Sequence, residues 1–389
     1  MTVVQALIDK GVRIVHPESV EIADDVDPGR ISGDGVVIHA GCRVRGASTV
    51  LSAGVELGSE GPVTLENCRL GPGVALKGGY AAKAVFLEGA NLGLGHHVRE
   101  GTILEEEANG AHTVGLKQTI LFPFVTLGSL INFCDLLMAG GTSRSDHSEV
   151  GSSYIHFNFT PSGDKTTPSL FGDVPRGVLL RERPIFLGGQ GGAVGPVRVA
   201  YGTVVGAGSI VRDDITTENE LHLVAPPATM SRPLDARGYP KLLPMLAKNL
   251  GYLANLEALE AWYRQARAPF FAAQHLGDLM LEGALAALAS ARAERLARLD
   301  KLRGKLDPAD PRHAPVIEAL PALLGLFGAG TPAASAGPLE PLVSRAGSAS
   351  YVAAVKGLTG AEAAPITGWL QGLIDERTAE AARVLPALG

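Results

Sequence analysis

The stretch VGPVRVAYGTVVGAGSIVRDD, residues 194–214, decides the fold of this chain. Val199, Val205 and Val211 recur in it at an interval of six, and glycine, alanine and serine are frequent between them. An interval of six fits neither the α-helix nor the two-residue alternation of an ordinary strand. It is typical of a parallel β-helix, in which each hexad forms one flat side of a triangular coil. We therefore expect one aliphatic side chain per side to point inward and small residues to turn the corners.

The same interval recurs upstream, joined by Gly-rich fillers such as GPG at 71–73 and GLG at 93–95. The spacing predicts roughly ten stacked coils over residues 12–230, each burying its aliphatic face against its neighbours. We predict left-handed winding from the small-residue type of hexad, against the general preference for right-handed parallel crossovers. The upstream positions at this interval are Val20, Val26, Ile38, Val44, Val50, Leu70, Leu76, Leu92, Val98 and Leu104.

The composition indicates a folded chain without a nucleic-acid partner. Of its 389 residues 49 are glycine, but 46% are hydrophobic and only 19% are charged, so we interpret the glycines as corner residues and not as a sign of disorder. The net charge is −6 and no run of lysine and arginine is present. We expect no nucleic-acid binding surface.

The cysteines and the N-terminus favour a cytoplasmic protein. Cys42, Cys68 and Cys134 form no CxxC pair, and we expect them to be buried as small hydrophobic residues. The opening MTVVQALIDKG carries an acidic residue and lacks the basic and apolar segments of a signal peptide. No apolar run reaches the length of a membrane span.

Beyond residue 230 the pattern changes to Ala/Leu/Arg-rich sequence with helical spacing. We divide the chain into a lead-in at 1–11, the β-helix at 12–230 and an all-α domain at 231–389. Two long helices are expected over 240–306, and two final ones over 339–357 and 361–386. Because each coil is expected to lean on its neighbours and not on the helices, a fragment ending near Arg237 is predicted to fold. Trp262, Tyr263, Phe270 and Phe271 are predicted to be core residues.

Three stretches carry a resemblance to a known family. IFLGGQGGAVGPVRVAYGTVVGAGSIVRDD (185–214), VGSSYIHFNF (150–159) and the opening ALIDKGVRIVHPESVEI resemble bacterial bifunctional N-acetylglucosamine-1-phosphate uridyltransferase/glucosamine-1-phosphate acetyltransferases. About residues 5–230 look like the acetyltransferase half of that family, without the nucleotidyltransferase domain. The resemblance implies a homotrimer, acetyl-CoA as cosubstrate between subunits, and a sugar phosphate or nucleotide sugar as acceptor.

The resemblance also implies site residues. Asn158 and Phe159 take the places of an Asn-Tyr pair near substrate and cofactor, and Lys165 takes that of a lysine that meets sugar or phosphate oxygens. Gly189 and Ala207 fall on the cofactor side, where a small residue lets the coenzyme A arm approach the backbone. The residue types by themselves also allow structural roles. Asn158 can satisfy a backbone group at a corner, Lys165 can be a solvated loop residue, and Ala207 can simply fill a corner.

The general base of the family is the main departure. Acetyl transfer to an amine requires a group that accepts a proton, and the family uses a histidine where this sequence has Asp135. His147 in TSRSDHSEVG and His156 in YIHFNF are the alternative candidates. We predict no metal site, because no acidic or thiol partner stands at ligand spacing from the other histidines, His96, His97 and His112.

The loop that follows Asn158 is rich in arginine. Arg176, Arg181 and Arg183 together with Lys165 suit recognition of phosphate or carboxylate by charge-assisted hydrogen bonds. Two functions therefore remain open. The first is an acyl-CoA-dependent transferase acting on an amino sugar phosphate or nucleotide sugar, and the second is a non-catalytic sugar-nucleotide-binding or assembly protein that lost the transfer residues.

Overall fold

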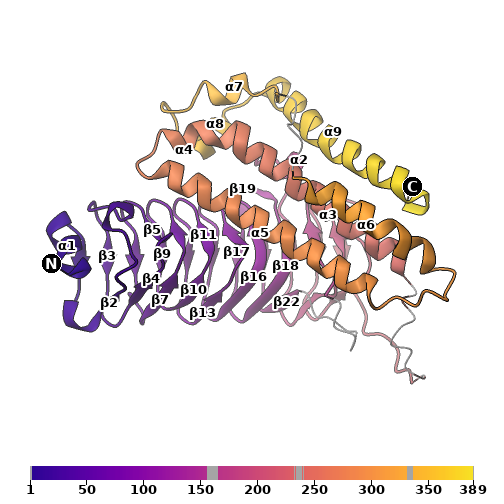
Figure 1. Ribbon diagram of the computed structural model, residues 1–389, viewed down its shortest axis with the longest axis horizontal. Coiled ribbons are helices and arrows are strands. Elements are labelled where there is room, and N and C mark those ends of the chain that lie inside the picture. The colour runs from indigo at the N-terminus through magenta and orange to yellow at the C-terminus, as the bar shows by residue number, and fades with distance from the viewer. Residues whose placement is uncertain are drawn as a thin grey trace.

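The computed structural model describes residues 2–155, 165–231, 233, 239, 241–330 and 336–388. It contains a parallel β-helix, along one side of which a set of long helices runs (Figure 1). The prediction of a left-handed β-helix of hexapeptide repeats followed by an α-helical region is confirmed. The aliphatic residues at the six-residue interval all point into the core, and none of them is more than 8% exposed.

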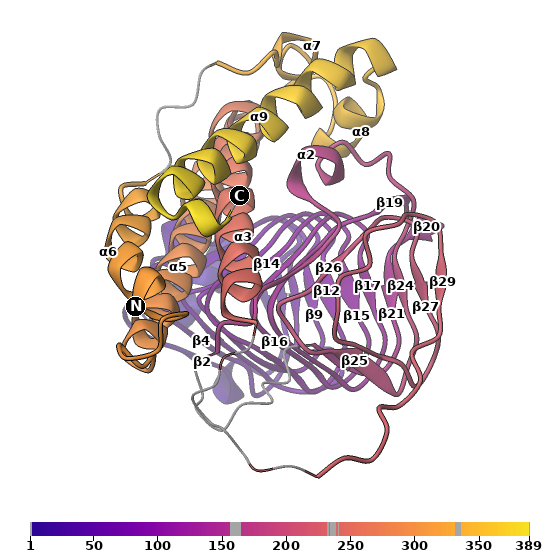
Figure 2. The same cartoon turned by 90° about the vertical axis from the view of Figure 1, so that its right-hand side faces the viewer.

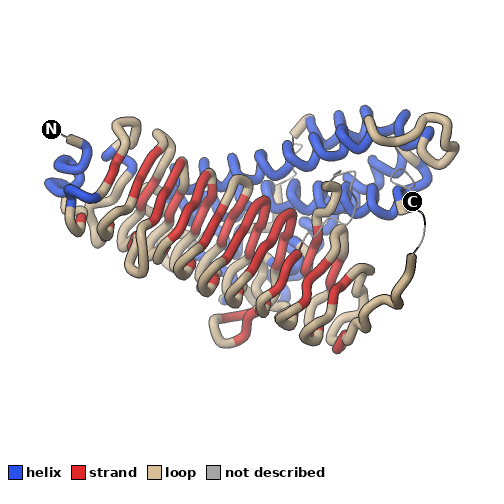
Figure 3. Tube along the Cα trace, turned by 90° about the horizontal axis from the view of Figure 1, so that it is seen from below, coloured by secondary structure: helices blue, strands red, loops and turns tan. Residues whose placement is uncertain are grey.

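Most coils contribute one strand to each of three walls, and strands of successive coils lie side by side and pair in parallel (Figure 3). The first wall consists of β1 (Arg13–Ile14), β3 (Val37–Ile38), β6 (Glu56–Leu57), β9 (Ala75–Leu76), β12 (Asn91–Leu92), β15 (Asn109–Gly110), β17 (Thr126–Leu127), β21 (Glu149–Val150), β24 (Phe186–Leu187), β27 (Val204–Val205) and β29 (Leu221–His222).

The second and third walls are joined by two long strands that pass round the corner between them, β16 (Val114–Leu121) and β18 (Ile131–Met138). The second wall further contains β2 (Glu21–Ile22), β4 (Arg43–Arg45), β7 (Val63–Glu66), β10 (Gly79–Ala82), β13 (His96–Val98), β22 (Ser153–Ile155), β25 (Gly191–Ala193) and β28 (Ile210–Val211). The third wall further contains β5 (Val50–Leu51), β8 (Arg69–Leu70), β11 (Ala84–Phe86), β14 (Thr102–Leu104), β23 (Ser169–Phe171) and β26 (Arg198–Val199).

A short helix, α1 (Val3–Lys10), precedes the first coil. The Thr2 hydroxyl caps its N-terminus by accepting from the Gln5 amide, and Gly11 ends it at φ +110°, a conformation that glycine adopts without strain. Leu7 of this helix is completely buried. The helix thus covers the first coil, whose aliphatic residues have no preceding coil to pack against.

The helical region begins with α3 (Leu242–Trp262), which continues through a wider turn at Tyr263–Arg267 into α4 (Ala268–Ala272). It continues with α5 (Gly277–Arg303), α6 (Ala314–Gly328) and α9 (Gly360–Val384). The two predicted long helices over 240–306 are confirmed. The aromatic side chains predicted to be core residues, Trp262, Tyr263, Phe270 and Phe271, are all at most 6% exposed.

The prediction of one helix over 339–357 is wrong. The structure has two short helices there, α7 (Glu340–Val343) and α8 (Tyr351–Lys356). Gly347 between them adopts φ +80°, and the Ser350 hydroxyl accepts from the Ala353 amide to begin α8 anew. Serine and glycine in SRAGSAS therefore act as breaker and cap.

The third wall is covered by the helices, as the end-on view of Figure 2 shows. Register aligns its outward-pointing residues in one row, and five consecutive members are aliphatic and no more than 6% exposed. Helix α5 contacts β8, β11 and β14, and α3 contacts β23. We call this row the aliphatic row: Val85, Ile103, Ile120, Leu137 and Leu170. The expectation that the coils do not lean on the helical domain is therefore wrong, because one wall is apolar on both faces.

Candidate functional site

The corner between the first and second walls changes character along the β-helix. The residue two positions after each first-wall strand is large or polar in the middle coils and small in the last ones. The series runs Leu94, His112, Ser129, Ser152, Gly189 and Ala207. Ala207 is exposed and Gly189 is half-buried. The structure thus brings together the two residues predicted on the cofactor side.

The backbone at this corner lies close together from one coil to the next. A Cβ built on Gly151 would come within 2.6 Å of the Gly189 nitrogen, and one built on Gly188 within 2.5 Å of the Ala207 nitrogen. Side chains are therefore excluded from these positions by sterics. The result is a strip of backbone without large side chains, at which Gly189 is half-buried and Ala207 is exposed.

Exposed apolar side chains flank this strip on the first wall. Phe186, Val204 and Leu221 occupy equivalent outward positions in three consecutive coils and are 39%, 40% and 66% exposed. Leu223 lies just beyond the same corner and is 74% exposed. Contiguous exposed apolar residues of this kind mark interaction surfaces. Sequence reasoning missed this row, although its members stand at the outward positions of the hexads.

The structure places Asp135 in an interdomain ion pair. The residue turns the corner between the second and third walls at φ +54°, and its side chain is 8% exposed. Its Oδ1 lies 2.6 Å from Nη2 of Arg295 on α5, and its Oδ2 accepts from the Thr167 hydroxyl at 3.3 Å. Because both oxygens are engaged inside the protein, this placement favours a structural role over proton transfer.

His147 lies away from the small-residue corner. It belongs to the antiparallel hairpin of β19 (Gly141–Ser143) and β20 (Asp146–His147), which precedes the first-wall strand β21, whereas Gly151 follows that strand. The hairpin is fixed by Arg144, whose guanidinium donates to the carbonyls of Glu107 and Phe124. Within one chain, His147 and Ala207 therefore lie at opposite ends of the first wall.

The predicted phosphate cluster is not brought together. Lys165 is exposed, and its carbonyl accepts from Arg295 of α5 at 2.8 Å. Arg181 instead donates to the Leu358 carbonyl just before α9. Arg176 contacts three carboxylates, and these acidic partners raise its pKa further against the opposing effect of burial. His156, Asn158 and Phe159 lie outside the described residues.

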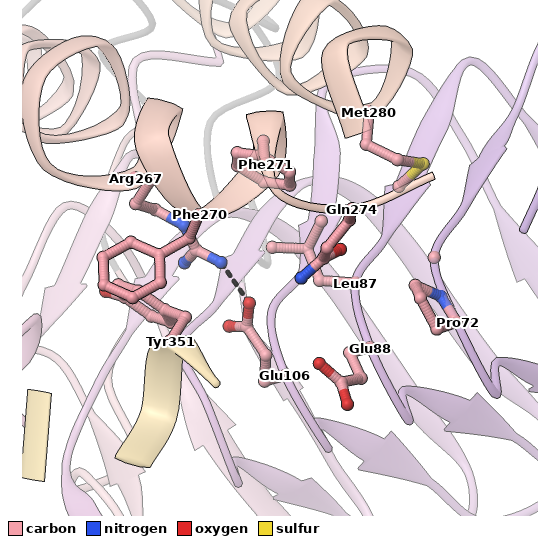
Figure 4. Close-up of a pocket in the computed structure, with 11 residues that line it drawn as sticks. Pro72, Leu87, Glu88, Glu106, Arg267, Phe270, Phe271, Gln274, Met280 and Tyr351 are labelled. Carbon is pink, nitrogen blue, oxygen red and sulfur yellow. Dashed lines mark hydrogen bonds and ion pairs between the residues drawn. The ribbon is translucent and has the colours of Figure 1, made fainter. Parts of the chain in front are cut away.

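A buried charged cluster joins the β-helix to the helices (Figure 4). Arg267 is 1% exposed, pairs with Glu105 at 3.1 Å and with Glu106, and lies over the Tyr351 ring at 3.9 Å. The Tyr263 hydroxyl donates to Glu105 at 2.5 Å. Burial raises the pKa of Glu105 to about 7, although Arg267 opposes the shift. No sequence signal pointed to these residues, because the pairing joins positions more than 150 residues apart.

Two further properties concern metals and membranes. Across the described ranges, no three or more His, Cys, Asp or Glu side chains are grouped so that they could hold a metal ion. Among these same residues, none of the helices combines the length and apolar character that a membrane span requires.

Comparison with known proteins gives the following relatives. The chain is similar to bifunctional protein GlmU of Thermotoga sp. strain RQ2, at 26% identity over 216 residues that cover 55% of this chain and 43% of that protein. It is also similar to bifunctional protein GlmU of Mycolicibacterium smegmatis, at 27% identity over 205 residues that cover 53% of this chain and 37% of that protein. A solved structure, UDP-N-acetylglucosamine acyltransferase from Campylobacter jejuni, matches at 13% identity with a TM-score of 0.18, covering 53% of this chain and 67% of that one.

No family model matches the chain. The chain spans less than half the length of the curated relatives it matches. Over about half of its own length it resembles the bacterial bifunctional uridyltransferase/acetyltransferase proteins, as the opening of the chain and the stretches 150–159 and 185–214 predicted.

Proposed function

We propose that this protein is a cytoplasmic acyltransferase that moves an acyl group, with acetyl as the first candidate, from an acyl-CoA to an amino sugar phosphate or nucleotide sugar. The observation that carries the proposal is the strip of backbone without large side chains at Gly189 and Ala207. It lies in the segment that resembles the acetyltransferase half of the related family, and the proteins named GlmU support it.

The proposed reaction requires a bound acceptor amine, a bound thioester and a group that accepts a proton. The amine nitrogen of the acceptor attacks the thioester carbonyl, the C–S bond breaks, and coenzyme A leaves as the thiol. The nitrogen loses a proton, which a base must accept. We keep His147 and His156 as the candidates for that base, and Asn158, Phe159, Lys165 and Arg181 as candidates for holding the acceptor.

A homotrimer completes the proposal. Within one chain His147 and Ala207 lie at opposite edges of the first wall, so the proposal has a neighbouring subunit supply one of the two. The row of Phe186, Val204 and Leu221 offers an uncovered apolar contact surface for such an assembly, whereas the third wall is already covered by the helices.

We expect Ala207→Leu to weaken binding of acetyl-CoA at least tenfold while leaving the fold intact. Ala207 is exposed, so the larger side chain has room in the free protein but obstructs a ligand lying along the strip. Isothermal titration calorimetry measures the change. Ala111→Leu, an exposed alanine at the same corner in an earlier coil, is the control and should bind as the unaltered protein does. Equal affinities in all three proteins would place the cofactor elsewhere.

We expect analytical ultracentrifugation to give three times the chain mass of 40.3 kDa at micromolar concentration. Val204→Glu should dissociate the assembly, because it introduces a carboxylate in the middle of the exposed apolar row. Asn109→Glu, at the same outward position of an earlier coil, tests whether charge alone has this effect. A monomeric unaltered protein would remove the site between subunits.

The non-catalytic alternative is favoured by one observation, the ion pair that occupies Asp135. A protein of that kind binds a nucleotide sugar but releases no coenzyme A from acetyl-CoA. Ligand binding without thiol release over a panel of amino sugars would therefore select it.

A further inference from the structure

The aliphatic row on the third wall has an arginine at each end. Arg69 precedes Val85 and Arg198 follows Leu170 at equivalent outward positions. Each arginine lies against a helix glycine, because a Cβ on Gly283 would come within 2.3 Å of Arg69 and one on Gly251 within 2.6 Å of the Arg198 Nη2. Both ends of the row thus carry an arginine beside a helix glycine, but Arg69 is buried whereas Arg198 is exposed.

The two arginines differ in what they bind. Arg69 is 5% exposed, donates to the Leu279 carbonyl at 3.2 Å and pairs with Glu282 at 3.4 Å, both on α5. Arg198 is exposed, and its guanidinium has no hydrogen-bond or ion-pair partner in the part of the chain that the structure describes. Asp214, whose Oδ1 accepts from the Arg198 backbone amide at 2.9 Å, is engaged by Lys248 at 2.8 Å.

The Arg198 side chain lines a cleft of about 380 Å³ between the β-helix and the helices. This volume lies within the range of roughly 300–1,000 Å³ that is typical of small-molecule sites. Leu170 and Ile215 line it on the β-helix side, and Gln371, Asp375 and Thr378 line it on α9. An apolar floor with a few convergent polar groups is the usual form of a binding site.

The charges in the cleft indicate the sign of its ligand. Arg176 also lines it, but its guanidinium contacts Asp173, Glu182 and Glu218. Arg198 therefore supplies a positive charge without an ion-pair partner, in a cleft that Asp375 also lines, and an arginine fork matches a phosphate or a carboxylate. On α9, the Asp375 carboxylate accepts from Gln371 at 2.8 Å and retains acceptor capacity for a hydroxyl group.

We propose that this cleft binds a small hydroxylated molecule with one anionic group, which Arg198 holds while Asp375 accepts from a hydroxyl. The site is separate from the corner at Gly189 and Ala207, because the third wall is opposite that corner in the triangular coil. It is a second ligand site, built from the β-helix and the helical domain together, and it does not rest on the acyltransferase proposal.

The test uses the full chain and four probes, titrated by isothermal calorimetry at low salt: inorganic phosphate, glucose 1-phosphate, glucuronate and free glucose. We expect the unaltered protein to bind at least one anionic probe and to bind free glucose at least tenfold more weakly than that probe. Comparison of the two phosphate probes with glucuronate shows whether the site prefers a phosphate or a carboxylate. Arg198→Ala should weaken binding of the anionic probe tenfold or more, and the loss should shrink as salt is raised.

Gly251→Ala separates binding from folding. Alanine has a higher helix propensity than glycine, so the substitution in the interior of α3 should not destabilise the helix. The new Cβ, however, displaces the Arg198 guanidinium. We expect anion binding to weaken in this variant without a loss of thermal stability. Arg212→Ala removes an exposed arginine from a neighbouring coil and should leave the affinity unchanged. Failure of every anionic probe to bind, or equal affinity in the Arg198 and Gly251 variants and the unaltered protein, would overturn the proposal.

Discussion

A chain that ends at Arg237 is expected to be insoluble, in contrast to the full-length protein. This truncation removes the helices and exposes the aliphatic row, whose five members are buried in the full chain. Burial of one aliphatic side chain stabilises a protein by roughly 1.5–3 kcal/mol, so exposing five costs roughly 8–15 kcal/mol, as much as the roughly 5–15 kcal/mol of a typical domain. Expression of both proteins and comparison of their soluble fractions measures the effect.

A variant of the fragment serves as its control. Val85→Thr, Ile103→Lys and Leu137→Lys make the outward face of the third wall polar while leaving the inward residues unchanged. We expect these changes to restore solubility, because an outward position on a strand tolerates a polar side chain when water covers it. A soluble fragment that unfolds cooperatively without them would show that the coils are independent of the helices.

Arg267→Met is expected to lower the free energy of unfolding by about 3–5 kcal/mol, the usual cost of removing one partner from a buried ion pair. Glu105 and Glu106 face this guanidinium from the β-helix, and at most 7% of either residue is exposed. Methionine fills a similar volume but leaves both carboxylates without a cation. Urea denaturation, with the slope checked for two-state behaviour, gives the change.

Arg264→Met is the matched control for this measurement. Arg264 lies in the same segment, three residues earlier, and pairs with Glu260, but its side chain is 55% exposed. An exposed pair of this kind contributes less than about 1 kcal/mol. Equal losses in the two variants would mean that the Arg267 cluster does not hold the helices to the β-helix.

The β-helix could be predicted from sequence because one local rule governs it. Val199, Val205 and Val211 point inward for the same reason as Val44 or Leu76, and each needs only the coil before and after it. The small corner residues Gly189 and Ala207 follow the same rule, which is why the sequence predicts that they lie close together. The long helices could also be predicted, because the spacing of apolar residues that indicates a helix is a local property of the sequence.

The docking of the helices could not be predicted in this way. It depends on Arg267 meeting Glu105 and on Arg295 meeting Asp135, contacts that join distant parts of the chain. A pairing of this kind leaves no period in the sequence. For the same reason Asp135 was interpreted as a candidate base, and Lys165 and Arg181 as one cluster, although the structure assigns them different neighbours.

One cue to the covered wall was present. Val85, Ile103 and Ile120 stand at outward positions where neighbouring walls carry polar residues such as Glu56 or Asn109. Aliphatic residues at both inward and outward positions of a strand indicate a strand that is covered on both faces. The sequence therefore contained the evidence for a covered wall, but not for what covers it.

Thiol release from acetyl-CoA tests the proposed function most directly. The full-length protein is mixed with acetyl-CoA and, in turn, with glucosamine 1-phosphate and with amino-group-bearing nucleotide sugars, and free coenzyme A is followed by its reaction with a chromogenic disulfide. The proposal predicts release that requires one of these acceptors and falls at least tenfold in Ala207→Leu but not in Ala111→Leu. Absence of release with every acceptor, or release that Ala207→Leu leaves unchanged, would contradict it.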